Sequence, residues 1–151
     1  MRAELPSAAQ VFRAIPCFLG RLLVAARAMT RLYNDEMRAV SLEITQFSIL
    51  QLLQQLGPMT QNQLGERLAA SKTTVSRNVG LLEKHGWVSV EVGEDRRAKV
   101  LSLSNRGRLL LEKAEPLWER AQARFRAEIS GAQLRALQDL LPTVAEAALR
   151  A

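Results

Sequence analysis

Cysteine and histidine are almost absent from this sequence, which holds one of each among its 151 residues. The single cysteine, Cys17, cannot form an internal disulfide, and its isolation suits a reducing cytosol. The single histidine, His85, has no second histidine and no cysteine cluster to join it as a metal ligand. We therefore expect neither a disulfide framework nor a metal site.

The motifs of the common catalytic sites are missing as well. The chain contains no glycine-rich phosphate loop, no His-Glu-x-x-His helix, no Cys-x-x-Cys pair and no Ser-His-Asp set with a usable base. We expect no enzymatic activity, no catalytic residue and no cofactor. No apolar run approaches the roughly 18 residues that a membrane span needs, and residues 1–12 lack an apolar signal core. We therefore expect a cytoplasmic protein with no membrane partner.

Positive charge is in excess, because 21 Lys and Arg residues face 15 Asp and Glu residues and give a net charge of +6. This balance favours an anionic partner such as nucleic acid or a membrane surface. A basic protein without such a partner has the same balance, so charge alone leaves the question open. Hydrophobic residues make up 48% of the chain, which is enough to form a core.

Apolar residues recur at helical spacing over about 16–40 and again over about 105–151, which predicts long amphipathic helices near both ends of the chain. Pro16 can occupy the first turn of the first helix, and residues 1–14 are expected to form a flexible arm. A continuous apolar stripe has to be covered by another helix, so helices of this kind favour a homodimer. The expected interface residues are Phe18, Leu22, Leu117, Trp118, Phe125, Leu137 and Leu141.

The middle segment, about 45–107, has shorter elements. Helices are predicted to begin at Thr45, at Thr60 and at Ser71, the last two marked by a Thr-x-x-Gln capping pattern and by an N-cap serine. From Val88 to Leu103 apolar and polar residues alternate on both sides of a charged turn, which predicts a β-hairpin. The predicted fold is mostly α with a small hairpin wing, a winged helix-turn-helix inside a single domain over 15–151.

This layout is typical of proteins that read DNA, because the second helix of the pair can lie in the major groove with its first residues at the base edges. Its hydroxyl, amide and guanidinium groups suit base contacts, and its lysine suits a phosphate. These candidate residues are Ser71, Lys72, Thr73, Thr74, Ser76, Arg77 and Asn78. An ordinary polar helix start has the same composition. A winged helix can also bind protein, but only DNA binding should weaken steeply with salt.

The hairpin supplies the second candidate element. Arg96 and Arg97 lie at its tip and Lys99 follows, a pattern suited to a minor groove, where the negative potential attracts arginine. Asp95 is expected to pair with one arginine and hold it in position rather than to touch DNA. A solvated charged turn is the alternative interpretation of this segment.

Several blocks of the sequence resemble the core of the multiple-antibiotic-resistance regulator (MarR) family. They are the segments 63–68, 71–77 and 81–88, and the segment 95–107, which is similar to the family's wing signature of Asp-x-Arg followed by Leu-Ser/Thr-x-x-Gly. The resemblance extends from about Pro16 to the end of the chain. It implies a transcription regulator, expected to be a repressor, that acts as a homodimer of its first and last helices on an inverted-repeat duplex. It also implies Arg97 at the minor groove, steadied by Asp95.

The resemblance raises two further questions. The family often binds small aromatic anions between its dimerisation helices and its DNA-binding lobes, and Arg21, Arg27 or Arg31 would suit such an effector pocket. One branch senses organic hydroperoxides through a cysteine near the start of the first helix, where Cys17 lies. That branch has a tyrosine one turn later, and here the position is Arg21. We therefore favour a small buried apolar role for Cys17 over a redox role.

Overall fold

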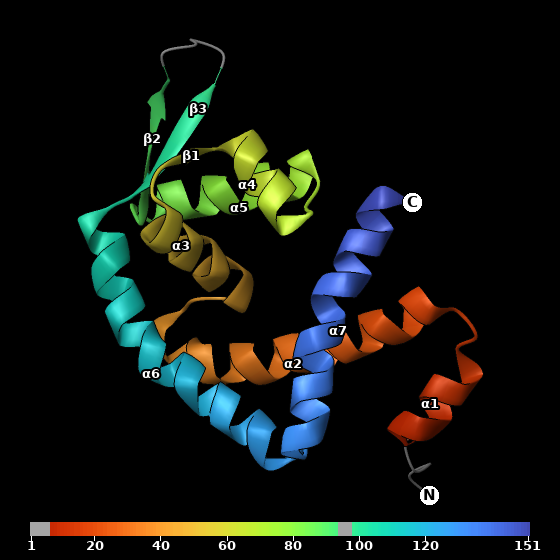
Figure 1. Ribbon diagram of the computed structural model, residues 1–151. Coiled ribbons are helices and arrows are strands. Elements are labelled where there is room, and N and C mark those ends of the chain that lie inside the picture. Colours follow the sequence, from red (N-terminus) through yellow and green to blue (C-terminus); the bar gives the residue numbers. More distant parts are fainter. Residues whose placement is uncertain (1–6, 94–97) are drawn as a thin grey trace, which may run out of the picture.

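The computed structural model describes residues 7–93 and 98–151 and confirms a mostly helical winged helix-turn-helix with a small antiparallel sheet. The wing and the short helices α4 and α5 lie at one end of the molecule, and α1 and α2 lie at the other (Figure 1). The elements are α1 (Ala8–Ala14), α2 (Phe18–Met37), the 3-10 turn η1 (Arg38–Val40), α3 (Ile44–Leu56), β1 (Met59–Thr60), α4 (Gln61–Leu68), α5 (Lys72–Lys84), β2 (Val88–Val92), β3 (Lys99–Leu103), α6 (Asn105–Ala127) and α7 (Gly131–Arg150).

Side-chain caps fix where the helices begin. The Thr60 hydroxyl accepts from the Gln63 amide, and the Gln63 side chain accepts from the Thr60 amide, so α4 starts with a complete capping box. Ser71 caps α5 by accepting from the amide of Thr74. Both starts agree with the sequence predictions to within one residue, because a cap satisfies amides that have no partner inside the helix.

The first residues correct two expectations. Residues 8–14 form α1 instead of an irregular arm, because Ser7 and Gln10 make a capping box at its start. Pro16 does not open the long helix: α2 begins at Phe18, and Pro16 lies in the connection before it. The Arg21 side chain crosses this connection, since its Nε donates to the Ile15 carbonyl over 2.7 Å.

The sheet has three strands in the order β1-β3-β2, one more than the sequence predicts. The hairpin pairs Val88 with Leu103 and Val92 with Lys99. The short strand β1 pairs with the other edge of β3, with Thr60 opposite Val100. A strand of two residues has no alternation to detect, so it was not predicted. Its pairing brings the start of α4 against the root of the wing.

The core of the chain lies between α3, α5 and the sheet. Its completely buried large side chains include those of Phe47, Leu50 and Leu82. Trp118 of α6 stacks on Phe47 with a ring-centroid distance of 6.1 Å and belongs to this intrachain core. Trp118 is half-buried within the subunit, and its expected place in the dimer interface stays a prediction.

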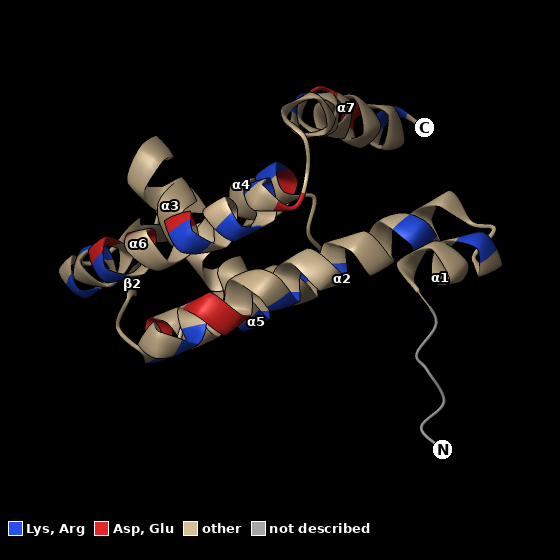
Figure 2. Cartoon of the chain, turned by 90° about the horizontal axis from the view of Figure 1, so that it is seen from below, with Lys and Arg blue, Asp and Glu red and all other residues tan. Residues whose placement is uncertain are grey.

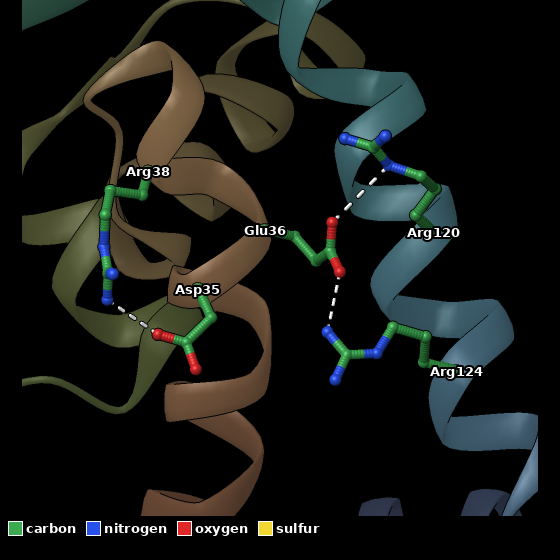
Figure 3. Close-up of polar contacts among 5 residues, drawn as sticks. All are labelled: Asp35, Glu36, Arg38, Arg120 and Arg124. Carbon is green, nitrogen blue, oxygen red and sulfur yellow. Dashed lines mark hydrogen bonds and ion pairs between the residues drawn. The ribbon is translucent and has the colours of Figure 1, made fainter.

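Two ion pairs join α2 to α6. Glu36 lies between Arg124, at 2.7 Å, and Arg120, at 3.4 Å, whereas its neighbour Asp35 pairs with Arg38 on its own side of the chain (Figure 3). The Glu36 side chain is only 18% exposed, so these contacts are partly shielded from solvent. They hold the second half of α6 against the last turns of α2. Nearby, burial raises the pKa of Tyr33, and the charge of Arg126 opposes that rise.

Candidate nucleic-acid interface

Helix α5 has one buried face and one open face. Val75, Val79 and Leu82 recur at helical spacing and are at most 3% exposed, which anchors the helix to the core. The opposite face carries Lys72, Thr73, Ser76 and Arg77, all exposed and lining one shallow hollow. Four of the seven residues predicted to contact DNA are therefore brought together on a single polar surface.

Thr74 and Asn78 lie to the side of that surface. The Asn78 amide donates to the Thr74 carbonyl over 3.0 Å, and the Thr74 hydroxyl lies 2.9 Å from the Ser71 hydroxyl. Both residues line a cavity of about 260 Å³ between α5 and α3, together with Thr45 and Ser48 of α3. Their side chains are thus engaged with their own helix and with this cavity. Helical spacing accounts for this division, because Thr74 and Asn78, four residues apart, border the buried face of the helix, a signal that the sequence analysis did not use.

The root of the wing is described, and its tip is not. Lys99 is exposed at the start of β3, opposite Val92 at the end of β2. Asp95, Arg96 and Arg97, expected to form the basic tip with its supporting carboxylate, lie outside the described residues. Their roles remain predictions.

A junction of backbone contacts joins α5, the wing and α6. The Ser104 hydroxyl donates to the Gly86 carbonyl over 2.7 Å, and the Ser104 amide donates to the Trp87 carbonyl over 3.1 Å. Gly107 is buried against the same place: a Cβ atom there would overlap with the Trp87 carbonyl oxygen and lie 2.7 Å from Leu103 Cδ1. The sequence analysis included Ser104 and Gly107 only as part of the wing signature and did not predict this junction. The signal for it was Gly107, a glycine inside a predicted helix.

The charge distribution does not by itself select the DNA-binding face. Basic segments occur on helices throughout the fold, interspersed with acidic ones (Figure 2). What distinguishes the open face of α5 is the combination of Lys72 and Arg77 with two hydroxyl groups on a helix that the core holds in place. Such a surface offers the groups that read base edges and phosphates.

The expected dimer residues divide into two groups. Phe18 is 68% exposed and Leu141 is 47% exposed, so these apolar side chains have little cover within the subunit. Leu22, Leu117 and Leu137 are half-buried, as is Phe125. No residue of α7 is buried, and Leu140 and Leu149 are also exposed by more than half.

The other candidate residues lie far from α5 in the chain. Cys17 is exposed at the N-cap of α2 and makes no side-chain capping bond, so the expectation that it is buried is wrong within the subunit. Arg21, Arg27 and Arg31 lie along α2, where Arg21 is half-buried and the other two are exposed. Over residues 7–93 and 98–151, no group of His, Cys, Asp and Glu is arranged to hold a metal ion, and no helix is long and apolar enough to cross a membrane.

The comparisons with known proteins agree with this geometry. The sequence profile of the MarR family matches residues 41–98, which include α3, α4, α5 and the first strand of the hairpin, β2. The uncharacterized HTH-type transcriptional regulator YwoH of Bacillus subtilis is 35% identical over 80 residues, or 53% of this chain and 58% of that protein. The organic hydroperoxide resistance transcriptional regulator of the same organism is 30% identical over 99 residues, or 65% of this chain and 66% of that protein. The matches thus span about three fifths to two thirds of these curated relatives.

Among solved structures, the Mycobacterium tuberculosis transcriptional regulator MosR in complex with DNA superimposes with a TM-score of 0.76 and 32% identity. The match covers 87% of this chain and 98% of that one, and so includes the end helices as well as the winged helix. The family consists of transcription regulators and not of enzymes. This chain belongs to the MarR family of DNA-binding, winged-helix transcription regulators.

Proposed function

We propose that this protein is a homodimeric repressor that binds an inverted-repeat operator through α5 and the wing. The observation that carries the proposal is the division of α5 into a buried anchor face and an exposed face of Lys72, Thr73, Ser76 and Arg77. A helix of this kind can enter a major groove without losing its contact with the core. The similarity to MosR, which was solved with DNA, supports the same placement.

The dimer is supported by apolar surface that one subunit leaves uncovered. Phe18, Leu19 and Leu23 project from the first turns of α2 with 68%, 59% and 42% exposure. Helix α7 has no buried residue in its 20-residue length, although Leu140 and Leu141 lie on it. Two long amphipathic helices with open apolar faces are stabilised by packing on their symmetry mates. A monomer that stays folded in sedimentation at micromolar concentration would contradict this part of the proposal.

The wing contributes affinity more than sequence discrimination. Arg96 and Arg97 are proposed to reach the minor groove, whose pattern of donors and acceptors separates A·T from G·C but little else. Repression follows when the bound dimer occupies DNA that the transcription machinery requires. The reducing interior of a bacterial cell is the proposed compartment.

Release by a small molecule is proposed at the cavity between α3 and α5. Its floor is apolar, with Ile49 and Val75, and its rim carries the hydroxyl groups of Thr45 and Thr74. No charged side chain lines it, so it suits a small apolar or aromatic molecule with hydrogen-bonding groups. A ligand bound in this cavity would contact α5 and could displace it from the position in which it is proposed to bind DNA.

The test of the DNA-binding surface is a titration of Arg77→Ala on the operator and on scrambled DNA, the operator being obtained by selection from a random duplex pool. Loss of a bidentate base contact should cost about 1–3 kcal/mol on the operator and relax the preference at one position of each half-site. Lys113→Ala is the control, because it removes one exposed positive charge from the middle of α6. Equal weakening on both DNAs would show that Arg77 grips the backbone and does not read sequence.

The wing is tested in the same titrations over a salt series. Arg97→Ala should weaken binding to both DNAs and flatten the log–log salt dependence by roughly one unit for each lost phosphate contact in each subunit. Unchanged affinity and an unchanged slope would remove the wing from the interface. A protein that binds no duplex at any salt concentration would overturn the proposed function as a whole.

A further inference from the structure

The strand β1 brings two polar side chains without an assigned role, Gln61 and Asn62, to the root of the wing, where the predicted DNA-binding residue Lys99 lies. In its antiparallel pairing with β3, Met59 faces Leu101 and Thr60 faces Val100. The next step of the same register places Gln61, the first residue of α4, beside Lys99, the first residue of β3. The start of α4 and the root of the wing therefore share one surface, although about 38 positions separate them in the chain.

A hollow of about 200 Å³ opens at this place. It is lined by Thr60, Gln61 and Asn62 from the start of α4, and by Ala98 and Lys99 from the wing. Its volume is several times the roughly 30 Å³ that one water molecule occupies, so it is large enough for a tetrahedral oxyanion. The side chains of Asn62 and Lys99 are exposed to solvent, and Gln61 is half-buried.

The chemistry of the lining selects an anion. Two carboxamides supply N–H donors and the Lys99 ammonium supplies a positive charge, while none of the five lining residues is a carboxylate. Among the described residues, no side-chain hydrogen bond or ion pair engages Gln61, Asn62 or Lys99, so these groups are not already satisfied by one another. The neighbouring cap is undisturbed, because it uses Thr60 and Gln63.

The location of the hollow identifies the source of the anion. It lies between the start of α4 on one side and the root of the wing on the other. Figure 1 shows that α4, α5 and the wing lie at the same end of the molecule. When α5 occupies a major groove and the wing the adjacent minor groove, the sugar-phosphate backbone that separates those grooves has to pass between the two elements. We propose that Gln61, Asn62 and Lys99 bind one backbone phosphodiester of each half-site, and we call this site the phosphate seat. This proposal rests on the proposed DNA-binding function.

A seat of this kind positions the protein and does not read sequence. It fixes the register of the dimer on the duplex, so that the base-reading groups of α5 meet the same edges each time. Its contribution should therefore be equal on operator and on scrambled DNA. This separates it from Arg77, whose loss is expected to fall mainly on the operator.

The experiment combines protein variants with DNA in which single phosphates are neutral. Methylphosphonate is placed, one position at a time, along the backbone of one operator half-site, and the affinity of wild type, Asn62→Ala and Lys99→Gln is measured on each duplex. Wild type should lose about three- to tenfold in affinity at the seated phosphate. Each variant changes both subunits of the dimer, so its loss on unmodified DNA should be about the square of that value, roughly ten- to hundredfold, and it should lose little more when that same phosphate is neutral. Lys99→Gln should also lower the salt slope by roughly one unit per subunit.

Gln54→Ala and Lys113→Gln are matched controls, because each changes an exposed side chain of the same type on α3 or α6. Both should keep the wild-type response at every phosphate. If Asn62→Ala and Lys99→Gln respond to each neutral phosphate as wild type does, the seat is refuted while operator binding stands. Coupling of Lys99 alone, without Asn62, overturns the amide part of the assignment. Unfolding midpoints within the error of wild type exclude loss of fold as the cause.

Discussion

Replacing Gly107 by alanine tests whether the junction between α5, the wing and α6 holds the fold together. The added Cβ would overlap with the carbonyl oxygen of Trp87, which already accepts the Ser104 amide at 3.1 Å, and it would lie 2.7 Å from Leu103 Cδ1. A leucine rotamer can turn away, but a hydrogen-bonded carbonyl can move only with its strand. Overpacking against backbone costs typically 1–3 kcal/mol, while alanine regains up to about 1 kcal/mol of helix propensity. We expect a net loss of about 1–2 kcal/mol in the free energy of unfolding.

Gly80→Ala is the matched control, because Gly80 is also inside a helix and a Cβ there would have nothing within 4 Å. This variant should be more stable than wild type by about 0.5–1 kcal/mol. Urea denaturation of all three proteins at one fixed protein concentration gives the comparison, since the stability of a dimer depends on concentration. If Gly107→Ala has the same free energy of unfolding as Gly80→Ala, the junction accommodates a Cβ atom without loss of stability, and the predicted steric conflict is refuted.

Further predictions concern the ion pairs, the helix-turn-helix turn and a buried phenol. Glu36→Gln should lower the free energy of unfolding by about 1 kcal/mol at low salt and by less in 1 M salt, whereas Asp35→Asn, which removes an exposed pair, should cost under roughly 0.5 kcal/mol. Ala69 has a left-handed φ of 48°, so Ala69→Gly should be at least about 1 kcal/mol more favourable than Ala123→Gly within α6, both measured by urea denaturation. Because burial raises the pKa of Tyr33 above its ordinary value of 10.0, the folded state holds the phenolic proton longer than the unfolded state, and stability should fall as pH rises through and above 10. The free energy of unfolding of Tyr33→Phe should therefore fall less than that of wild type between pH 9 and 11. Identical pH profiles of stability for the two proteins would contradict the raised pKa of Tyr33.

Much of the fold was predictable because local signals and burial agree. Thr60 and Ser71 each accept the amide three residues on, as the capping pattern and the N-cap serine predict. The same pattern at Ser7 and Gln10 was present in the sequence but was not used, and residues 1–14 were expected to form a flexible arm. The strand β1 was not predicted for another reason: its two residues form a strand only because they pair with β3, which is distant in the sequence.

The site was predictable in composition but not in its geometry. Polar residues at the start of α5 were expected to contact DNA as one set, yet Thr74 and Asn78 line the cavity toward α3, whereas Thr73 and Arg77 line the open hollow. The helical spacing of the buried residues of α5 carries this division, because it fixes which positions border the buried face. The stacking of Trp118 on Phe47 was likewise not predicted, because Phe47 lies in a distant segment of the chain.

The junction at Ser104 and Gly107 has a consequence for how operators are told apart. The Ser104 hydroxyl and amide donate to the Gly86 and Trp87 carbonyls, and Gly107 lies close to Trp87, so the end of α5, the first residue pairs of the wing and the start of α6 are held together. If α5 and the wing bind DNA as proposed, these contacts resist a change in the angle between them. The duplex has to adjust its groove widths and twist instead, and it does so at an energetic cost that depends on its base steps. Base pairs between the two grooves that no side chain touches therefore enter the affinity. A stiff A-tract and a flexible pyrimidine–purine step at such a position should give different dissociation constants on the same contacted bases.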